Sequence, residues 1–285
     1  MGQERWADVA VANPGQVSPR FVALIRRYLL PVVRVLWRPT LTGTAHLPAG
    51  PYLLVANHSA GIGFAEIHSF VALYLHQVGP QRPLAGFALP LGFQVWPLSA
   101  LHRQLGTIPS SYKAAAATLA KGVPILVFPG GDYESVKPIW HANRVDFGGR
   151  LGFLRIAHAA GVPIVPLGIR GGHFTAPVLL RSTWLANVLV QPRLMAVKRW
   201  GLSALGLAGA LALLAWVPAG WPMRIALAWL WLGSPLVFLP WLPWTVRLVI
   251  GPPLPATVLG DGSDAALRRA LVQVEAAVQA AVNAP

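Results

Sequence analysis

Short runs of consecutive apolar residues alternate with longer helical patterns through the central part of the chain. Three runs have the length and unbroken hydrophobicity of strands buried on both faces: 51–56, 123–128 and 162–168. Helical patterns lie between or beside these runs: 64–79, 110–122 and 149–160. This alternation predicts an α/β fold, in which a central, mainly parallel sheet is flanked by helices and the strand ends carry the functional site.

Residues 20–38 carry the pattern of a basic amphipathic helix, which Pro31 is expected to kink. At about 100° per residue, four arginines fall along one stripe: Arg20, Arg27, Arg34 and Arg38. Apolar surface comes from Phe21, Leu24, Ile25, Leu29, Val32 and Leu36. The helix either packs on the domain or lies in the headgroup region of an anionic membrane. We favour the membrane, because no acidic residue offsets the arginines.

Residues 201–243 form two apolar blocks around a short turn that holds Arg224, the only charged residue between Trp200 and Val246. Each block is at the lower limit of the length that spans about 30 Å of hydrocarbon. Basic residues flank the pair on both sides, so both ends belong on the cytoplasmic side of a membrane. We therefore expect a re-entrant or interfacial hairpin in preference to two true spans, with a buried soluble hairpin as the third alternative.

The last part of the chain returns to ordinary patterns: a strand over 245–251, and a helix over 261–281 that Ser263 caps. Residues 83–98 are apolar and rich in proline and glycine, which favours a lid-like or membrane-proximal segment. The expected organisation has four parts. They are an N-terminal polar segment and interfacial helix (1–43), a catalytic α/β core (44–198), a hydrophobic membrane-associated hairpin (199–244), and a strand and helix that complete the core (245–285).

Composition strengthens the membrane interpretation. Hydrophobic residues make up 55% of the chain and charged residues 11%, against about 25% charged residues in ordinary soluble domains; mean hydropathy is +0.54. The net charge of +14 suits anionic lipid headgroups, an anionic co-substrate such as coenzyme A, or nucleic acid. No nucleic-acid-binding motif accompanies the charge, so we expect no nucleic-acid partner. Residues 1–19 lack an apolar signal core, which predicts a protein on the cytoplasmic face of a membrane.

Candidate chemistry is restricted by the scarcity of reactive side chains. The chain has no cysteine, which excludes a thiolate nucleophile, a disulfide framework and a cysteine metal site. Between residues 9 and 260 there are four carboxylates: Glu66, Asp132, Glu134 and Asp146. His58 follows the first buried run and precedes a glycine-containing turn, a position typical of a general base in α/β enzymes. Residues 128–135 form a second glycine turn at a strand end, which suits an anion or a close substrate contact.

Four blocks occur in a characteristic order: Asn57-His58, Leu105-Gly-Thr-Ile-Pro109, Phe128-Pro-Gly-Gly131 and Val162-Pro-Ile-Val-Pro166. In order and spacing they resemble the glycerolipid acyltransferase family over roughly residues 40–175. The Pro-Gly-Gly-x-x-Glu form of the third block, followed by Gly149–Phe153, is most similar to the mono- and diacylglycerol acyltransferase-like branch. The chain departs from the family pattern at Gly63, where the family has an aspartate, and at Gly130, where many members have a glutamate.

The resemblance implies transfer of a fatty acyl group from acyl-CoA or acyl carrier protein to a hydroxyl of a lysophospholipid or other glycerolipid. His58 would be the general base, without a covalent acyl-enzyme and without a cofactor or metal beyond the acyl donor. Glu66 is the first candidate for its carboxylate partner, Glu134 the second and Asp132 the third. The expected substrate-binding residues are Asn57, Ser59, Arg103, Phe128, Pro129, Gly130, Gly131, Asp132, Lys137 and Arg150, with Arg144 a further candidate for phosphate. The main alternative is a catalytically inactive lipid-binding or membrane-scaffolding protein on the same fold.

Overall fold

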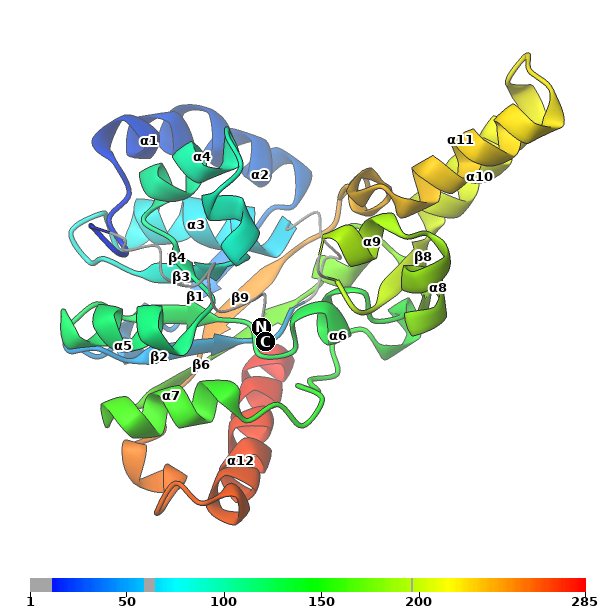
Figure 1. Cartoon of the computed structure of the whole chain (residues 1–285). Coiled ribbons are helices and arrows are strands. Elements are labelled where there is room, and N and C mark those ends of the chain that lie inside the picture. The colour runs from blue at the N-terminus through cyan, green and yellow to red at the C-terminus, as the bar shows by residue number, and fades with distance from the viewer. Residues whose placement is uncertain (1–11, 59–64, 196) are drawn as a thin grey trace.

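A computed structural model describes residues 12–58, 65–195 and 197–285 and shows a seven-stranded sheet between two layers of helices (Figure 1). The strand order is β1-β9-β6-β2-β5-β3-β4, and the β6–β9 pair is antiparallel, whereas the other neighbours are parallel. The strands span β1 (Thr40–Thr42), β2 (Leu53–Ala56), β3 (Ala85–Ala88), β4 (Ile108–Pro109), β5 (Ile125–Val127), β6 (Ile164–Arg170) and β9 (Arg247–Ile250). The predicted α/β class with a mainly parallel sheet is confirmed.

The central strand, β2, separates two hydrophobic cores, because its alternate side chains point to opposite faces of the sheet. Leu54 and Ala56 belong to the core on one face, with α1 (Pro19–Leu24), α2 (Leu30–Leu36) and α3 (Ala65–Gln77). Leu53 and Val55 belong to the other core, with α5 (Tyr112–Ala120), α7 (Gly152–Ala160) and α12 (Asp264–Asn283). All four β2 side chains are fully buried. A strand with both faces covered needs the unbroken apolar run that the sequence contains.

The segment 83–98, expected to be lid-like, contributes β3 to the interior of the sheet, between β5 and β4. That expectation is wrong for residues 85–88. Gly86 and the flanking Pro83 and Pro90 hide the strand pattern, since both residue types are uncommon within strands. A 3-10 turn, η4 (Pro90–Phe93), and the helix α4 (Leu98–Leu105) follow β3.

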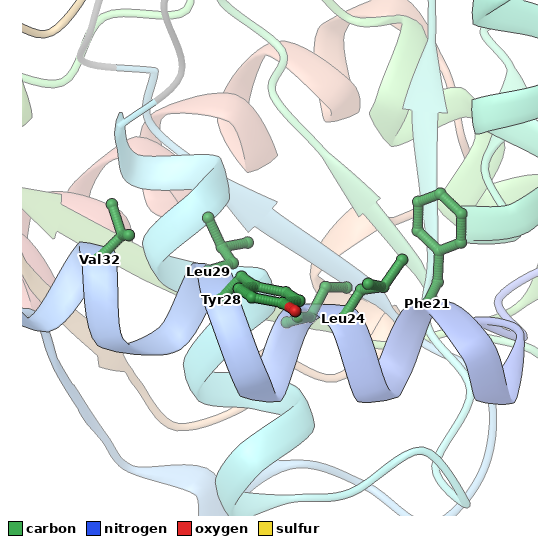
Figure 2. A pocket seen from close by; sticks show the side chains of 6 residues that line it. Phe21, Leu24, Tyr28, Leu29 and Val32 are labelled. Atoms are coloured by element: carbon green, nitrogen blue, oxygen red, sulfur yellow. The ribbon is translucent and has the colours of Figure 1, made fainter.

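The N-terminal helical run has two apolar faces. It consists of α1, the π-helical turn η2 (Ile25–Leu29) and α2, with the π-turn ending two residues before Pro31. Its core-facing side chains are Val22, Ile25, Leu30, Val33 and Trp37. Of the apolar residues named from the sequence, Ile25 is buried in the core and Leu36 is exposed. Phe21, Leu24, Leu29 and Val32 lie with Tyr28 along an open outer groove, of which Ile25 forms part of the lining (Figure 2).

Beyond β6 the chain builds a smaller unit beside the main sheet. Strands β7 (Val178–Ser182) and β8 (Trp200–Ser203) pair antiparallel, with α8 (Thr183–Val188) and α9 (Gln191–Leu194) between them. Next come two antiparallel helices, α10 (Ala204–Trp216) and α11 (Trp221–Gly233), which extend away from the rest of the molecule (Figure 1). Across residues 12–58, 65–195 and 197–285, no helix is both long and apolar enough to cross a bilayer.

The remaining short elements are 3-10 turns. They are η3 (Thr44–His46), η5 (Ile139–His141), η6 (Gly172–Phe174), η7 (Pro235–Phe238) and η8 (Ala256–Leu259). A five-residue helix, α6 (Gly131–Ser135), follows β5 directly. Because β2, β5 and β6 are adjacent and parallel, η6, α6 and the residues after β2 meet at one edge of the sheet.

Candidate active site

Asn57 fixes the backbone where β2 ends. Its side-chain amide donates to the carbonyl of Ile169 at 2.8 Å, and its side-chain oxygen accepts from the Ile169 N–H at 2.7 Å. Asn57 is 1% exposed, and the polar groups of its side chain bind the backbone of the neighbouring strand β6. This pairing continues the β2–β6 ladder by one side chain and places His58 at the sheet edge.

The imidazole of His58 is held between a carboxylate and an aromatic ring. Its Nδ1 lies 2.6 Å from Oε1 of Glu66, in the first turn of α3, and its ring centroid lies 4.7 Å from that of Phe128. Glu66 is fully buried and His58 is 8% exposed. An ionised carboxylate only accepts hydrogen bonds, so with Glu66 ionised Nδ1 is the donor in this contact, and in a neutral imidazole the other ring nitrogen, Nε2, then has the lone pair.

Glu134 contacts the same histidine from another direction. Its Oε2 accepts from the backbone N–H of His58 at 3.1 Å, whereas its Oε1 accepts from Lys137 Nζ and from the Asp146 N–H, each at 3.2 Å. Burial raises the pKa of the Glu134 carboxyl, and the positive charge of Lys137 and the two backbone donors oppose that rise. Of the carboxylates proposed from the sequence, Glu66 therefore contacts the ring, while Glu134 contacts the backbone of His58.

Gly130 makes room for the Glu134 side chain. A Cβ atom at position 130 would lie under 3.0 Å from Cγ, Cδ and Oε2 of Glu134. The carboxylate of Glu134 therefore occupies the space beside Gly130 that any other residue type would fill. The absence of a side chain at 130 is a steric requirement of the Glu134–His58 contact.

The glycine turn itself is braced by Arg150. One guanidinium nitrogen donates to the carbonyls of Pro129 and Gly130, at 3.0 and 2.7 Å, and the other donates to Asp132 at 2.6 Å. The N–H of Gly131, a residue with φ of +45°, is bonded to the Phe128 carbonyl. In this conformation Arg150 and the Gly131 N–H stabilise the turn.

Lys137 and His173 lie buried behind the turn. Lys137 is 4% exposed, and its ammonium group donates to Glu134 and to the carbonyl of Arg144. This contact is incompatible with the expected role of Lys137 in holding a substrate phosphate, because the ammonium faces the interior. His173, from η6, is 3% exposed, and burial, with the nearby charge of Lys137, lowers its pKa to about 3. Neither ring nitrogen of His173 has a well-aligned hydrogen-bond partner within the described part of the chain.

The remaining predicted residues divide into two groups. Phe128, Pro129, Gly130, Gly131 and Asp132 form one continuous turn beside the His58 ring. Arg103 is exposed on α4, whose last turn is tied to the N-terminal segment through the Ser18 N–H and the Gln104 carbonyl. Ser59, together with Gly63, residues 1–11 and Ala196, lies outside the described residues.

Three aromatic and basic residues near the turn were not identified from the sequence. The guanidinium groups of Arg181 and Arg199 lie 4.0 and 5.2 Å from the Tyr133 ring centroid, and Arg181 also donates to the Tyr133 carbonyl. Arg181 lies on β7 and Arg199 directly precedes β8, so both are outside the four sequence blocks. The Arg-rich composition of that segment was the available signal, but no spacing linked it to the turn.

Comparisons with known proteins address the part of the chain that builds this site. Residues 38–170 match the profile of the family described as Acyltransferase. An uncharacterized protein of Mycobacterium leprae is 28% identical over 172 residues, which is 60% of this chain and 46% of that protein. An uncharacterized protein of Mycobacterium tuberculosis strain H37Rv is 30% identical over 178 residues, with corresponding shares of 61% and 49%. The chain thus spans about half the length of the curated relatives it matches.

Among solved structures, the chain is similar to the crystal structure of the 1-acyl-sn-glycerophosphate acyltransferase PlsC from Thermotoga maritima. The TM-score is 0.52 at 19% identity, and the match covers 92% of this chain and 78% of the other. At this level of identity the similarity establishes a shared fold.

Proposed function

Residues 38–170 match the model of the acyltransferase family, and from this match we propose that the chain transfers a fatty acyl group from a thioester donor to a hydroxyl group of a glycerolipid. The donor is acyl-CoA or acyl carrier protein, and the acceptor is a lysophospholipid or another glycerolipid with a free hydroxyl. The observation that carries the proposal is the 2.6 Å contact between His58 and Glu66 at the end of the central strand.

In the proposed reaction, Nε2 of His58 takes the proton of the acceptor hydroxyl as its oxygen attacks the thioester carbonyl carbon. The carbon–sulfur bond then breaks, the new ester forms, and the departing thiolate takes a proton back from the imidazolium. The negative charge of Glu66 stabilises the imidazolium and fixes its orientation. General base catalysis of this kind contributes about 10²- to 10⁴-fold to the rate. Since one histidine both accepts and returns the proton, the step needs no covalent acyl-enzyme.

The carbonyl oxygen becomes negatively charged during the attack and needs a hydrogen-bond donor. The Gly131 N–H is bonded within its own turn, so we assign this role to the neighbouring N–H of Gly130. The phosphate groups of the donor or acceptor would meet the basic residues around Tyr133, namely Arg181 and Arg199, in place of the buried Lys137. This assignment moves the anion-binding role from Lys137, which was expected from the sequence, to Arg181 on β7 and to Arg199, which directly precedes β8.

The outer groove of the N-terminal helical run is consistent with an acceptor that is a lipid. Leu24, Tyr28 and Val32, which line it, are 41–57% exposed, which is unusual for apolar side chains that lie next to one another. Arg27 and Arg34 are exposed on the same run. Apolar side chains flanked by arginines favour binding at an anionic membrane surface, where such acceptors are found.

The test uses purified full-length protein, labelled acyl-CoA or acyl carrier protein, and a panel of lysophospholipids and acylglycerols in mixed micelles. We expect His58→Ala to lower transfer by about 10²- to 10⁴-fold, and His141→Ala, at an exposed histidine, to leave it unchanged. Equal background transfer by wild type and His58→Ala across the whole panel would refute the proposal and favour a non-catalytic lipid-binding protein.

A further inference from the structure

The α10–α11 hairpin is apolar around its whole circumference. Both helices expose large apolar side chains, including Leu207, Leu211, Trp216, Trp221, Met223, Ile225 and Leu230. A helix that packs on a protein partner on one side keeps a polar face toward water, whereas a helix that is apolar all round is surrounded by an apolar medium. The hairpin extends beyond the body of the molecule (Figure 1), so its own domain does not supply that medium.

Several polar side chains of the hairpin are paired within it or at its base. Arg224, its one charged residue, donates from Nε to the Ala219 carbonyl at 2.8 Å and from Nη1 to the Leu214 carbonyl at 2.9 Å. These carbonyls belong to the end of α10 and the turn, where backbone acceptors lack partners inside a helix. The Trp231 indole donates to the Gly206 carbonyl at 3.0 Å. Internal pairing of this kind is what hydrocarbon requires, because it offers no hydrogen bonds of its own.

The length of the hairpin matches one leaflet of a bilayer. Each helix has 13 residues, and at about 1.5 Å per residue this gives roughly 20 Å. A bilayer has about 30 Å of hydrocarbon, so the hairpin is too short to cross it but long enough to reach its mid-plane.

The base of the hairpin carries the residues expected at a membrane–water interface. Trp184 on α8 and Leu194 on α9 are 65% and 75% exposed, and the basic residues Arg193 and Lys198 of the same segment are exposed as well. The α8 helix is tied to the hairpin through the Trp229 indole and the Val188 carbonyl, 3.0 Å apart. Tryptophan and basic side chains at one level are typical of the headgroup region of an anionic leaflet.

We propose that the α10–α11 hairpin inserts end-on into a single leaflet, with its turn near the bilayer mid-plane and α8–α9 at the level of the headgroups. The N–H groups of Lys198 and Arg199 are bonded to Asp132 at 3.2 and 3.1 Å. Insertion therefore places the glycine turn of the candidate active site at the membrane surface. The insertion itself does not depend on the proposed function.

The chain has no cysteine, so single cysteines can carry a polarity-sensitive fluorophore in the full-length protein. Suitable exposed positions are Trp216→Cys at the turn, Leu211→Cys midway along α10, and Leu236→Cys near the base. The matched control is Val272→Cys on α12, a 65% exposed position on the body. The labelled proteins are mixed with vesicles of phosphatidylcholine and phosphatidylglycerol that contain lipids with a quencher placed high or low on the acyl chain.

End-on insertion predicts a blue shift at 211 and 216 but not at 272. The deep quencher should be the stronger one at 216, and the shallow quencher the stronger one at 236. Replacing Arg193 and Lys198 by glutamine should weaken binding to these vesicles about fivefold for each charge removed.

Three results would overturn the proposal. One is equal, shallow quenching at all three hairpin positions, which means that the hairpin lies flat. Another is a blue shift that rises with protein concentration without vesicles, which means that a second copy covers the hairpin. The last is no response to vesicles. The readouts are the depth of a label and the strength of vesicle binding, so they test the insertion independently of acyl transfer.

Discussion

Replacing Glu134 by glutamine exchanges one carboxylate oxygen for an amide nitrogen at a position with 0% exposure. The carboxylate now accepts from the His58 N–H, the Asp146 N–H and the ammonium group of Lys137. After the change, the Lys137 charge has no anion beside it. Both carboxylate oxygens of Glu134 accept hydrogen bonds, so the amide nitrogen that replaces one of them is a donor that faces another donor.

The structure sets the expected size of the effect. Removing one partner of a buried ion pair costs about 3–5 kcal/mol. Lys137 keeps one acceptor, the Arg144 carbonyl, so we expect a loss near the lower end, about 3 kcal/mol. For a chain of this size each kcal/mol shifts Tm by about 2–4 °C. Glu134→Gln should therefore melt about 6–12 °C below wild type.

Urea denaturation of wild type, Glu134→Gln, Lys137→Met and the double variant measures the effect and its cause. In the double variant no charge is left unpaired, so it should regain at least half of the stability lost by Glu134→Gln. The control is Asp264→Asn, which removes the ion pair between Asp264 and Arg155. The Asp264 side chain is 66% exposed, so this variant should leave the urea denaturation curve unchanged. The reasoning fails if Glu134→Gln unfolds with wild type, or if the double variant is no more stable than Glu134→Gln.

Three further outcomes are expected. Glu66→Gln should lower kcat by about 10⁴-fold with KM unchanged, because an amide no longer fixes the donor nitrogen of His58; a preserved kcat would exclude this role. His173→Phe should flatten the pH dependence of unfolding. In wild type the unfolded chain binds a proton below about pH 6.5, while the native state does so only near the pKa of about 3. The free energy of unfolding of wild type should thus fall with decreasing pH by up to about 1.4 kcal/mol per pH unit. Denaturation of both proteins at a series of pH values measures this slope, and an unchanged slope in His173→Phe would show that His173 is not responsible. Gly168→Ala should cost about 3 kcal/mol, because its Cβ would lie under 3.0 Å from the backbone of α12, whereas Gly50→Ala meets nothing within 4 Å; equal stability of the two variants would contradict this packing.

Helix ends and buried strands were predictable because their causes are local. Ser263 accepts the Ala266 N–H at the start of α12, and Gly161 adopts a left-handed conformation at the end of α7. The apolar run that became β2 is fully buried. The antiparallel direction of β9 has no such local cause. It follows from pairing with β6, which is distant in sequence, and the pattern of residues 247–250 fits either direction.

In the candidate site, too, the contacts with a local cause were predictable and the others were not. His58 and Glu66 are eight residues apart, on a strand end and the first turn of the next helix, so their proximity follows from one short connection. Lys137 was expected at a phosphate because it is basic and near the glycine turn. It faces inward because it is three residues after Glu134 and follows α6, which brings the two charges together. A charge count along the sequence does not distinguish a cation that meets substrate from one that neutralises a buried acid.

Gly130 shows why a missing side chain can be part of a site. In the sequence, Gly130 departs from the pattern of the acyltransferase family that the chain resembles, and this departure removes a carboxylate from the turn. In the structure, a Cβ there would overlap the Glu134 side chain, and that side chain delivers its own carboxylate to the His58 N–H. Positions 130 and 134 are thus sterically coupled, because the Glu134 side chain that accepts from the His58 N–H passes through the space that a Cβ at position 130 would occupy. The turn therefore retains a carboxylate beside His58, supplied from four residues further along the chain.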